Sequence, residues 1–170
     1  MLSIELMRDA FGRVNAAVHS VLRDADREFL TFRPDPGANT VAWLIWHLTR
    51  VQDDHLAELQ GSEQVWTGEG WAKRFALPFE PAATGYGQSA DEVAAVRSDA
   101  ALLAGYHDAV HARTLGYLAT LAEVDFARIV DTRWTPPVTL AVRLVSVLAD
   151  DLQHVGQAAY LRGLAERSGL

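Results

Sequence analysis

The sequence predicts an all-α protein, a four-helix bundle with a long loop between the second and third helices. Apolar residues recur at helical spacing in four long segments, and little of the chain alternates in the way typical of strands. The stretch between the second and third segments has no sustained period, which predicts a loop. Four helices joined by one long crossover are typical of bundles. We expect residues 1–170 to form a single domain, because a chain of this length can bury its own core.

The first predicted helix extends from residue 2 to about residue 25, where apolar positions keep a helical period. The segment 33–38 (Arg-Pro-Asp-Pro-Gly-Ala) interrupts that pattern, because proline and glycine end helices. Asn39 or Thr40 can cap a second helix, which is predicted to run to about Leu59.

The long loop is predicted from Gly61 to Gln88. It contains glycines, prolines and the aromatic residues Trp66, Trp71 and Phe75. The aromatic content favours an ordered loop, and ordered loops of this length in small domains are usually functional.

The segment 89–92 (Ser-Ala-Asp-Glu) has the form of a capping box and is expected to open a third helix. That helix is predicted to continue without a break to about Leu121. Residues 123–137 then form a connector. The last helix is predicted from Val138 or Thr139 to about Arg167, because Gly169 is typical of a helix end.

Composition excludes several classes of function. The formal net charge is −7 without a cluster of Lys or Arg, which argues against nucleic-acid binding. No apolar run approaches the length of a membrane span and the N-terminus lacks a signal pattern, so we expect a cytoplasmic protein that does not engage a membrane. The chain has no cysteine, so a catalytic thiol would have to come from a cosubstrate.

The strongest chemical signal lies in the last predicted helix. Asp150 and His154 are four residues apart in an apolar run, so they share one helix face. Burying a carboxylate and an imidazole costs free energy unless something pairs with them, and a metal ion pairs with both. His47 stands among apolar residues of the second helix. If the two helices are neighbours, these residues form a three-ligand metal site with one position open.

Spacing alone leaves alternatives open. Asp151 also shares a face with His154, so it could be the carboxylate ligand or orient a ligand by a hydrogen bond. His154 could equally be a core histidine with satisfied hydrogen bonds. His107 and His111 form a second pair at the same spacing, but the sequence suggests no third ligand for them.

Three further residues are weaker candidates for contacts with a bound substrate. Arg50 lies nearly one turn beyond the second-helix histidine and could attract a carboxylate, or it could form an ion pair with Asp53 or Asp54. Trp71 could line a pocket, although tryptophan mostly fills cores. Gln157 follows the C-terminal histidine by about one turn and could reach a ligand or fill the bundle.

The motifs Trp46-His47-Leu48 and His154-Val-Gly-Gln157 together resemble the DinB/YfiT-like superfamily over nearly the whole chain. The resemblance implies a four-helix bundle that binds a divalent metal through one helix-two histidine and a ligand pair near the C-terminus. That pair is typically two histidines, and Asp150 replaces the first. A carboxylate at this place is similar to the branch of mycothiol-dependent maleylpyruvate isomerases and mycothiol S-transferases. Segments 39–43, 52–56 and 63–66 also resemble actinobacterial members of this group.

The resemblance implies zinc or nickel held by His47, Asp150 and His154, and a low-molecular-weight thiol such as mycothiol as cosubstrate. The implied activity is thiol S-transfer or isomerisation acting on small electrophiles, carried out by a homodimer. The alternative hypothesis is a non-catalytic, stress-related dimeric bundle that binds a metal and a small molecule.

Overall fold

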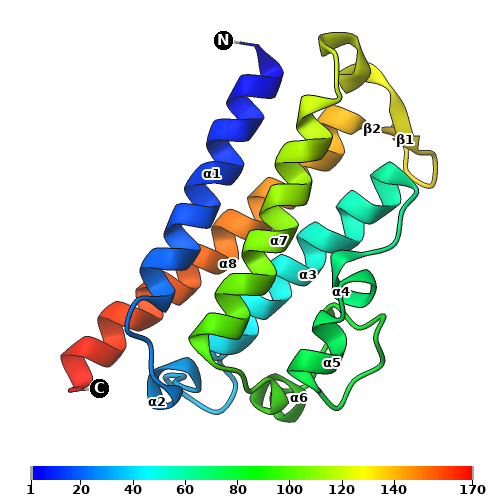
Figure 1. The fold of residues 1–170 in the computed structure, drawn as a ribbon. Coiled ribbons are helices and arrows are strands. Elements are labelled where there is room, and N and C mark those ends of the chain that lie inside the picture. Colours follow the sequence, from blue (N-terminus) through cyan, green and yellow to red (C-terminus); the bar gives the residue numbers. More distant parts are fainter. Residues whose placement is uncertain (1, 170) are drawn as a thin grey trace.

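Four long helices build the bundle that the sequence predicts, within residues 2–169 that the computed structural model describes (Figure 1). They are α1 (Ser3–Leu22), α3 (Val41–Gln60), α7 (Ala100–Ala119) and α8 (Leu140–Ser168). Both α1 and α3 pack against α7 and against α8. Helices α3 and α7 run in the same direction, so the chain between them must return along the bundle (Figure 1). We call this connecting segment, residues 61–99, the crossover. The all-α prediction is confirmed.

Local caps fix the start and the end of α3 and the start of α8. The Thr40 hydroxyl accepts a hydrogen bond from the Trp43 amide at 3.1 Å, so α3 begins at Val41 and Thr40, not Asn39, is its cap. The Thr139 hydroxyl caps α8 in the same way. Gly61 ends α3 with φ 60°, a left-handed conformation that suits glycine.

The prediction of one unbroken third helix from Ser89 to Leu121 is wrong. The capping box at Ser89 opens only α6 (Ala90–Ala95). The buried Val96 then leaves the helical conformation with ψ 95°, and Asp99 caps α7 by accepting from the Leu102 amide at 2.7 Å. Asp99 favours a helix start over a helix interior, which explains the break.

Several short elements lie where the sequence predicts loops or connectors. Each is too short to show a periodic apolar pattern. They are α2 (Arg27–Leu30), α4 (Val65–Gly68), α5 (Trp71–Phe75), the 3₁₀ helix η1 (Glu123–Ala127) and the antiparallel strands β1 (Ile129–Asp131) and β2 (Val138–Thr139). The prediction of an ordered aromatic loop between α3 and α7 agrees with α4 and α5, whose aromatic residues Trp66, Trp71 and Phe75 are buried.

The core has two parts. The larger part contains Trp46, Trp66 and Tyr106 beneath the crossover, and the smaller part surrounds Phe11 and Leu118. None of the helices in residues 2–169 is both long enough and apolar enough to cross a membrane.

His107 adds a buried polar group to α7. It is 1 % exposed, and its Nδ1 lies 3.1 Å from the Thr49 hydroxyl oxygen. That hydroxyl donates to the Ile45 carbonyl, so it accepts a hydrogen bond from the Nδ1–H of His107. Burial, with a smaller contribution from nearby His111, lowers the pKa of His107 to about 3.

This low pKa predicts that the protein loses stability in mild acid. An unfolded histidine takes up a proton near pH 6.5, whereas folded His107 stays neutral down to about pH 3. The unfolded state therefore binds more protons in this window, and stability falls as the pH falls from 6.5 toward 3. Between pH 6.5 and 5 the loss is about 2 kcal/mol. Urea unfolding at pH 7.5 and 5 of wild type and His107→Gln checks this: we expect the variant's pH dependence to be smaller by that amount, and equal dependence would contradict it.

Candidate metal centre

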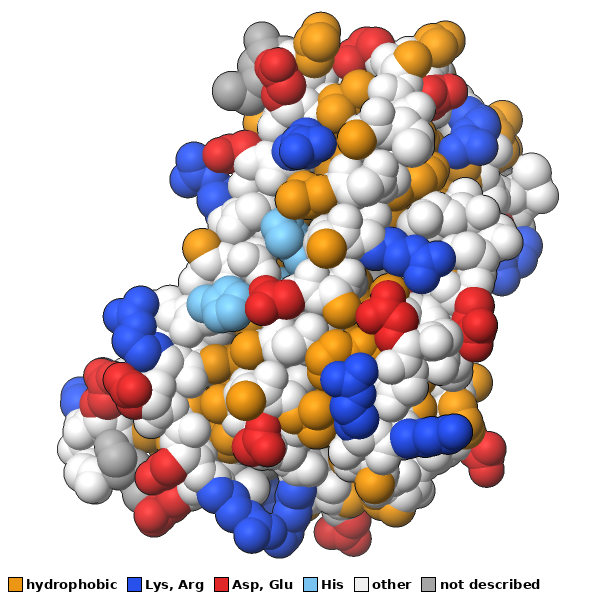
Figure 2. Space-filling view, in the orientation of Figure 1, with side chains coloured by type: hydrophobic (Ala, Val, Ile, Leu, Met, Phe, Trp, Pro, Cys, Tyr) orange, Lys and Arg blue, Asp and Glu red, His pale blue; other side chains and the backbone are white. Residues whose placement is uncertain are grey.

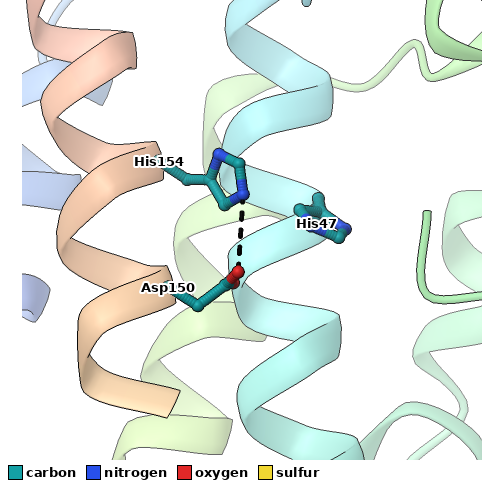
Figure 3. Close-up of side chains that lie close together, drawn as sticks. All are labelled: His47, Asp150 and His154. Carbon is teal, nitrogen blue, oxygen red and sulfur yellow. Dashed lines mark ion pairs between the residues drawn. The ribbon is translucent and has the colours of Figure 1, made fainter. Parts of the chain in front are cut away.

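Helices α3 and α8 bring three of the predicted ligands together (Figure 3). His47 on α3 faces Asp150 and His154 on α8, and one donor atom of each lies within 4.8 Å of the others. The imidazole rings of His47 and His154 are 4.8 Å apart at their centroids and nearly perpendicular. In residues 2–169 this is the one group of three or more such side chains close enough to share a metal ion.

His47 is fixed by groups on its own helix and on the crossover. The Trp43 ring stacks on it at 4.4 Å between centroids, tilted by 14°. Its Nδ1 lies 2.5 Å from the Thr84 carbonyl oxygen. A carbonyl only accepts, so Nδ1 carries the proton and the Nε2 lone pair is free to bind a metal.

His154 is arranged in a similar way. Its Nδ1 lies 2.9 Å from Gln157 Oε1, which accepts a hydrogen bond from Nδ1–H. Its Nε2 lies 3.6 Å from Asp150 Oδ1. The predicted contact residue Gln157 therefore orients a histidine, and both histidines present Nε2 to the space between them.

Burial distinguishes the two candidate carboxylates. Asp150 belongs to the cluster, and its buried Oδ2 has no hydrogen-bond partner among the described residues. Asp151 is 0 % exposed, and neither of its oxygens has a partner in that part of the chain. Burial, reinforced by the neighbouring Asp150 charge, raises the pKa of Asp151 well above its usual range. The geometry therefore favours Asp150, because an ionised carboxylate with an unpartnered oxygen suits a cation and a buried neutral carboxyl does not.

The charges of the cluster suit a metal ion as well. Burial lowers the pKa of His47, which keeps it neutral and able to coordinate. Burial alone would raise the pKa of Asp150, but His154 and His47 outweigh burial and lower it. The Asp150 carboxylate raises the pKa of His154, so a metal ion must displace a proton to coordinate this imidazole. The side chains of His154 and Asp150 are 18 % and 32 % exposed, so a ligand from solvent can reach them.

Arg50 lies in the protein interior, where it anchors the crossover. Its side chain is 0 % exposed. Its guanidinium donates to the carbonyls of Pro81 and Ala83 and to the Gln64 side chain, at 3.3, 3.1 and 2.8 Å. Of the two ion pairs that the sequence leaves open, the structure shows the one with Asp53, at 3.6 Å. Arg50 thus holds the backbone just before the Thr84 carbonyl, which accepts the hydrogen bond from His47.

Trp71 also packs the crossover against the core. It is 8 % exposed, packs on Tyr106 and stacks under the Arg74 guanidinium at 3.8 Å. These contacts bury the ring of this first residue of α5 in the core. None of them involves the three clustered side chains.

Sequence reasoning missed three residues of the crossover that support His47. Thr84 supplies the carbonyl, and Gln88 Oε1 accepts a hydrogen bond from Trp43 Nε1 at 2.7 Å. Gly85 adopts φ +98°, and a Cβ there would lie 2.6 Å from His47 Nδ1. Glycine is thus required both by the backbone conformation and by the close approach to the imidazole.

The rival pair on α7 does not form a comparable site. The rings of His107 and His111 are 6.4 Å apart at their centroids, and neither joins a group of three close donors within residues 2–169. Asp108, between them in sequence, instead binds His19 of α1 at 2.7 Å.

Comparisons with known proteins agree with the fold. A conserved protein from Enterococcus faecalis, known from its crystal structure, has 31 % sequence identity and a TM-score of 0.88. The similarity covers 95 % of this chain and 96 % of that chain. Comparison with functionally curated proteins gives no match. Residues 10–158 match the profile of the DinB superfamily, whose members are generally metal-binding. The chain belongs to the DinB superfamily.

Proposed function

We propose that this protein is a metal-dependent thiol S-transferase or isomerase that acts on small electrophiles. One observation carries the proposal: two imidazoles that present Nε2 and a carboxylate with an unpartnered oxygen converge between α3 and α8. Zinc and nickel both accept two nitrogens and one oxygen, and three protein ligands leave a position open.

The open position fits a thiol from outside the chain. When bound, a divalent metal lowers the pKa of a coordinated thiol and makes the thiolate available near neutral pH. The chain itself has no cysteine, so the sulfur must come from a cosubstrate. Mycothiol is the thiol that the resemblance to the carboxylate-bearing branch supports.

The protein's own residues hold and shield this position. Thr84 and Gln157 fix the two imidazole rings by accepting hydrogen bonds from their Nδ1–H groups. The ionised Asp150 supplies one negative charge, and a thiolate would supply a second, which together balance a divalent cation in a partly buried place. Trp43 covers one face of His47 and limits access of water from that side.

Metal content tests the site directly. We expect untagged wild-type protein to retain about one equivalent of divalent metal and His154→Ala to lose it, because two remaining ligands bind far more weakly. His111→Ala is the matched control, since it removes a half-buried histidine of the other pair and should leave metal content unchanged. Stoichiometric metal in His154→Ala would overturn the assignment.

Turnover needs a separate measurement. Incubating metal-loaded protein with mycothiol and a bromobimane should produce the conjugate faster than buffer does, and His154→Ala should abolish the excess rate. Metal binding without any conjugation above the buffer rate would instead favour the non-catalytic metal-binding bundle.

A further inference from the structure

One histidine outside the metal centre, His55 of α3, is held in a single tautomer by a neighbouring arginine. Its Nδ1 lies 2.9 Å from Arg143 Nη1 of α8. Arginine only donates hydrogen bonds, so Nδ1 is the unprotonated nitrogen. Glu58 Oε2 lies 3.8 Å from the same nitrogen, which is too far for a hydrogen bond. Burial and the Arg143 charge lower the pKa of His55, so the ring is neutral near pH 7 and carries its proton on Nε2.

Buried groups in turn hold Arg143. Its side chain is 12 % exposed, and Nη2 donates to Asp131 Oδ2 of β1 at 2.7 Å. The Asp131 side chain is 2 % exposed and also pairs with Arg133. A buried ion pair adds little net stability, because desolvation offsets the attraction between the charges. The pair does fix the guanidinium in one place, and the guanidinium fixes the tautomer of the imidazole.

The tautomer of His55 is the reverse of the one found in the metal centre. His47 and His154 each donate from Nδ1–H and present Nε2 to the space between them. His55 accepts at Nδ1 and presents Nε2–H. Its side chain is 30 % exposed, and Nε2 is open to solvent without a hydrogen-bond partner in residues 2–169. In this tautomer His55 is a hydrogen-bond donor and not a metal ligand.

A surface histidine on another face is arranged more simply. Imidazole groups lie among acidic, basic and apolar side chains on the face that α1 and α7 present (Figure 2). His19 Nε2 of α1 lies 2.7 Å from Asp108 Oδ1 of α7, and both side chains are about half exposed. An exposed pair of this kind contributes little stability, and it already occupies Nε2 of His19. The corresponding nitrogen of His55 remains available to a ligand.

The His55 ring points back toward the metal centre. His55 follows His47 by eight residues, a spacing that keeps both on one helix face about 12 Å apart along the axis. Helices α3 and α8 run in opposite directions (Figure 1). Glu58, later on α3, and Arg143, two turns before the α8 ligands, therefore lie beyond His55 as seen from the metal centre. Nδ1 faces these two residues, and helix side chains lean toward the N-terminus, so Nε2–H on the other side of the ring faces the metal centre.

We propose that His55 is a substrate-contacting residue, whose Nε2–H binds an acceptor oxygen of the thiol cosubstrate roughly 10 Å from the metal centre. This role rests on the proposed thiol transfer. The thiol is favoured over the electrophile because its sulfur occupies the open position, so only the thiol has a defined reach along the contact between α3 and α8. A thiol with a hydroxyl or carbonyl oxygen at this distance gains a hydrogen bond, and a shorter thiol does not. His55 therefore selects extended thiols.

Two conservative variants separate this role from a structural one. His55→Asn keeps an acceptor near the position of Nδ1, and so keeps Arg143 bound, but it has no donor near Nε2. His55→Gln places an amide donor near Nε2 and nothing near Nδ1. Isothermal titration of zinc-loaded protein with mycothiol should show binding about 3- to 10-fold weaker for His55→Asn and close to wild type for His55→Gln. Urea unfolding should show the reverse order, because only His55→Gln leaves the guanidinium without its partner.

Zinc affinity and a short thiol are the controls. We expect the same zinc affinity in wild type and both variants, because His55 is not one of the three clustered donors. Free cysteine is too short to reach His55 and should bind all three zinc-loaded proteins equally. Equal mycothiol affinity of wild type and His55→Asn would overturn this role and leave the thiol activity intact. If zinc-loaded wild type bound no mycothiol, the proposed function itself would fail, and this role with it.

The tautomer can be read without metal or thiol. Long-range ¹H–¹⁵N NMR of the metal-free protein at pH 7.5 distinguishes the two neutral forms of an imidazole, and the signals missing from His55→Asn identify those of His55. We expect a protonated Nε2 in wild type and a mixture of both forms in Arg143→Met, because the arginine no longer occupies Nδ1. A protonated Nδ1 in wild type would overturn the assigned donor, whatever the protein does with thiols.

Discussion

Replacing Arg50 by methionine is expected to destabilise the protein by about 3–5 kcal/mol, because removing one member of a buried ion pair leaves the other charge uncompensated. Asp53 would lose the guanidinium 3.6 Å away. It would keep the backbone amides of Val65 and Trp66 and the Tyr106 hydroxyl as donors, at 2.8–2.9 Å. Two crossover carbonyls, at Pro81 and Ala83, would lose their donor in the interior.

Urea unfolding of wild type, Arg50→Met and Arg74→Met measures this effect. Arg74 is exposed and stacks on Trp71, so its replacement removes an arginine–aromatic contact without leaving a buried charge. We expect Arg74→Met to cost less than about 1 kcal/mol. If Arg50→Met were equally mild, the interior network would not anchor the crossover.

The long helices could be predicted because their apolar positions recur over many turns. Thr40 and Gly169 also mark helix ends by local chemistry that the sequence displays. The break between α6 and α7 could not be predicted with the same ease. Val96 continues the apolar pattern, so the pattern hides the turn, which the structure shows in the ψ of 95° at Val96 and the cap at Asp99.

Asp150 and His154 could be predicted as a pair because i,i+4 spacing on one helix brings side chains close together, whereas His47 could join them only on the condition that the two helices are neighbours. The choice between Asp150 and Asp151 could not be predicted, since each of these residues shares a helix face with His154. It depends on which side of α8 meets the core, where Asp151 lies. The direction of the Arg50 side chain could not be predicted either, because a cation one turn from a ligand can point toward the site or into the interior.

The sequence pattern could not predict which crossover residues support His47. Thr84 is 37 residues from His47 in a stretch with no period, so nothing local predicts their contact. Only the packed fold shows that Arg50 holds Pro81 and Ala83, and that the following carbonyl then meets the imidazole.

Replacing Gly85 by alanine is expected to weaken metal binding by about 10- to 100-fold, the usual effect of disturbing a group that orients a ligand. The new methyl group would lie 2.6 Å from His47 Nδ1 and 3.1 Å from the rings of Trp43 and Trp46, so the crossover or the imidazole must move. Either movement breaks the hydrogen bond that keeps the Nδ1 proton on the Thr84 side. The left-handed backbone adds a stability loss of about 1–2 kcal/mol.

Gly87→Ala separates these two effects. Gly87 also has a positive φ, +72°, but a Cβ there would meet nothing within 4 Å in residues 2–169. We therefore expect both variants to unfold at lower urea concentration, while isothermal titration with zinc shows weaker binding only for Gly85→Ala. Equal zinc affinity in the two variants would mean that the crossover backbone does not control the orientation of His47. A selective loss would show that the loop completes a metal centre whose ligands all come from α3 and α8.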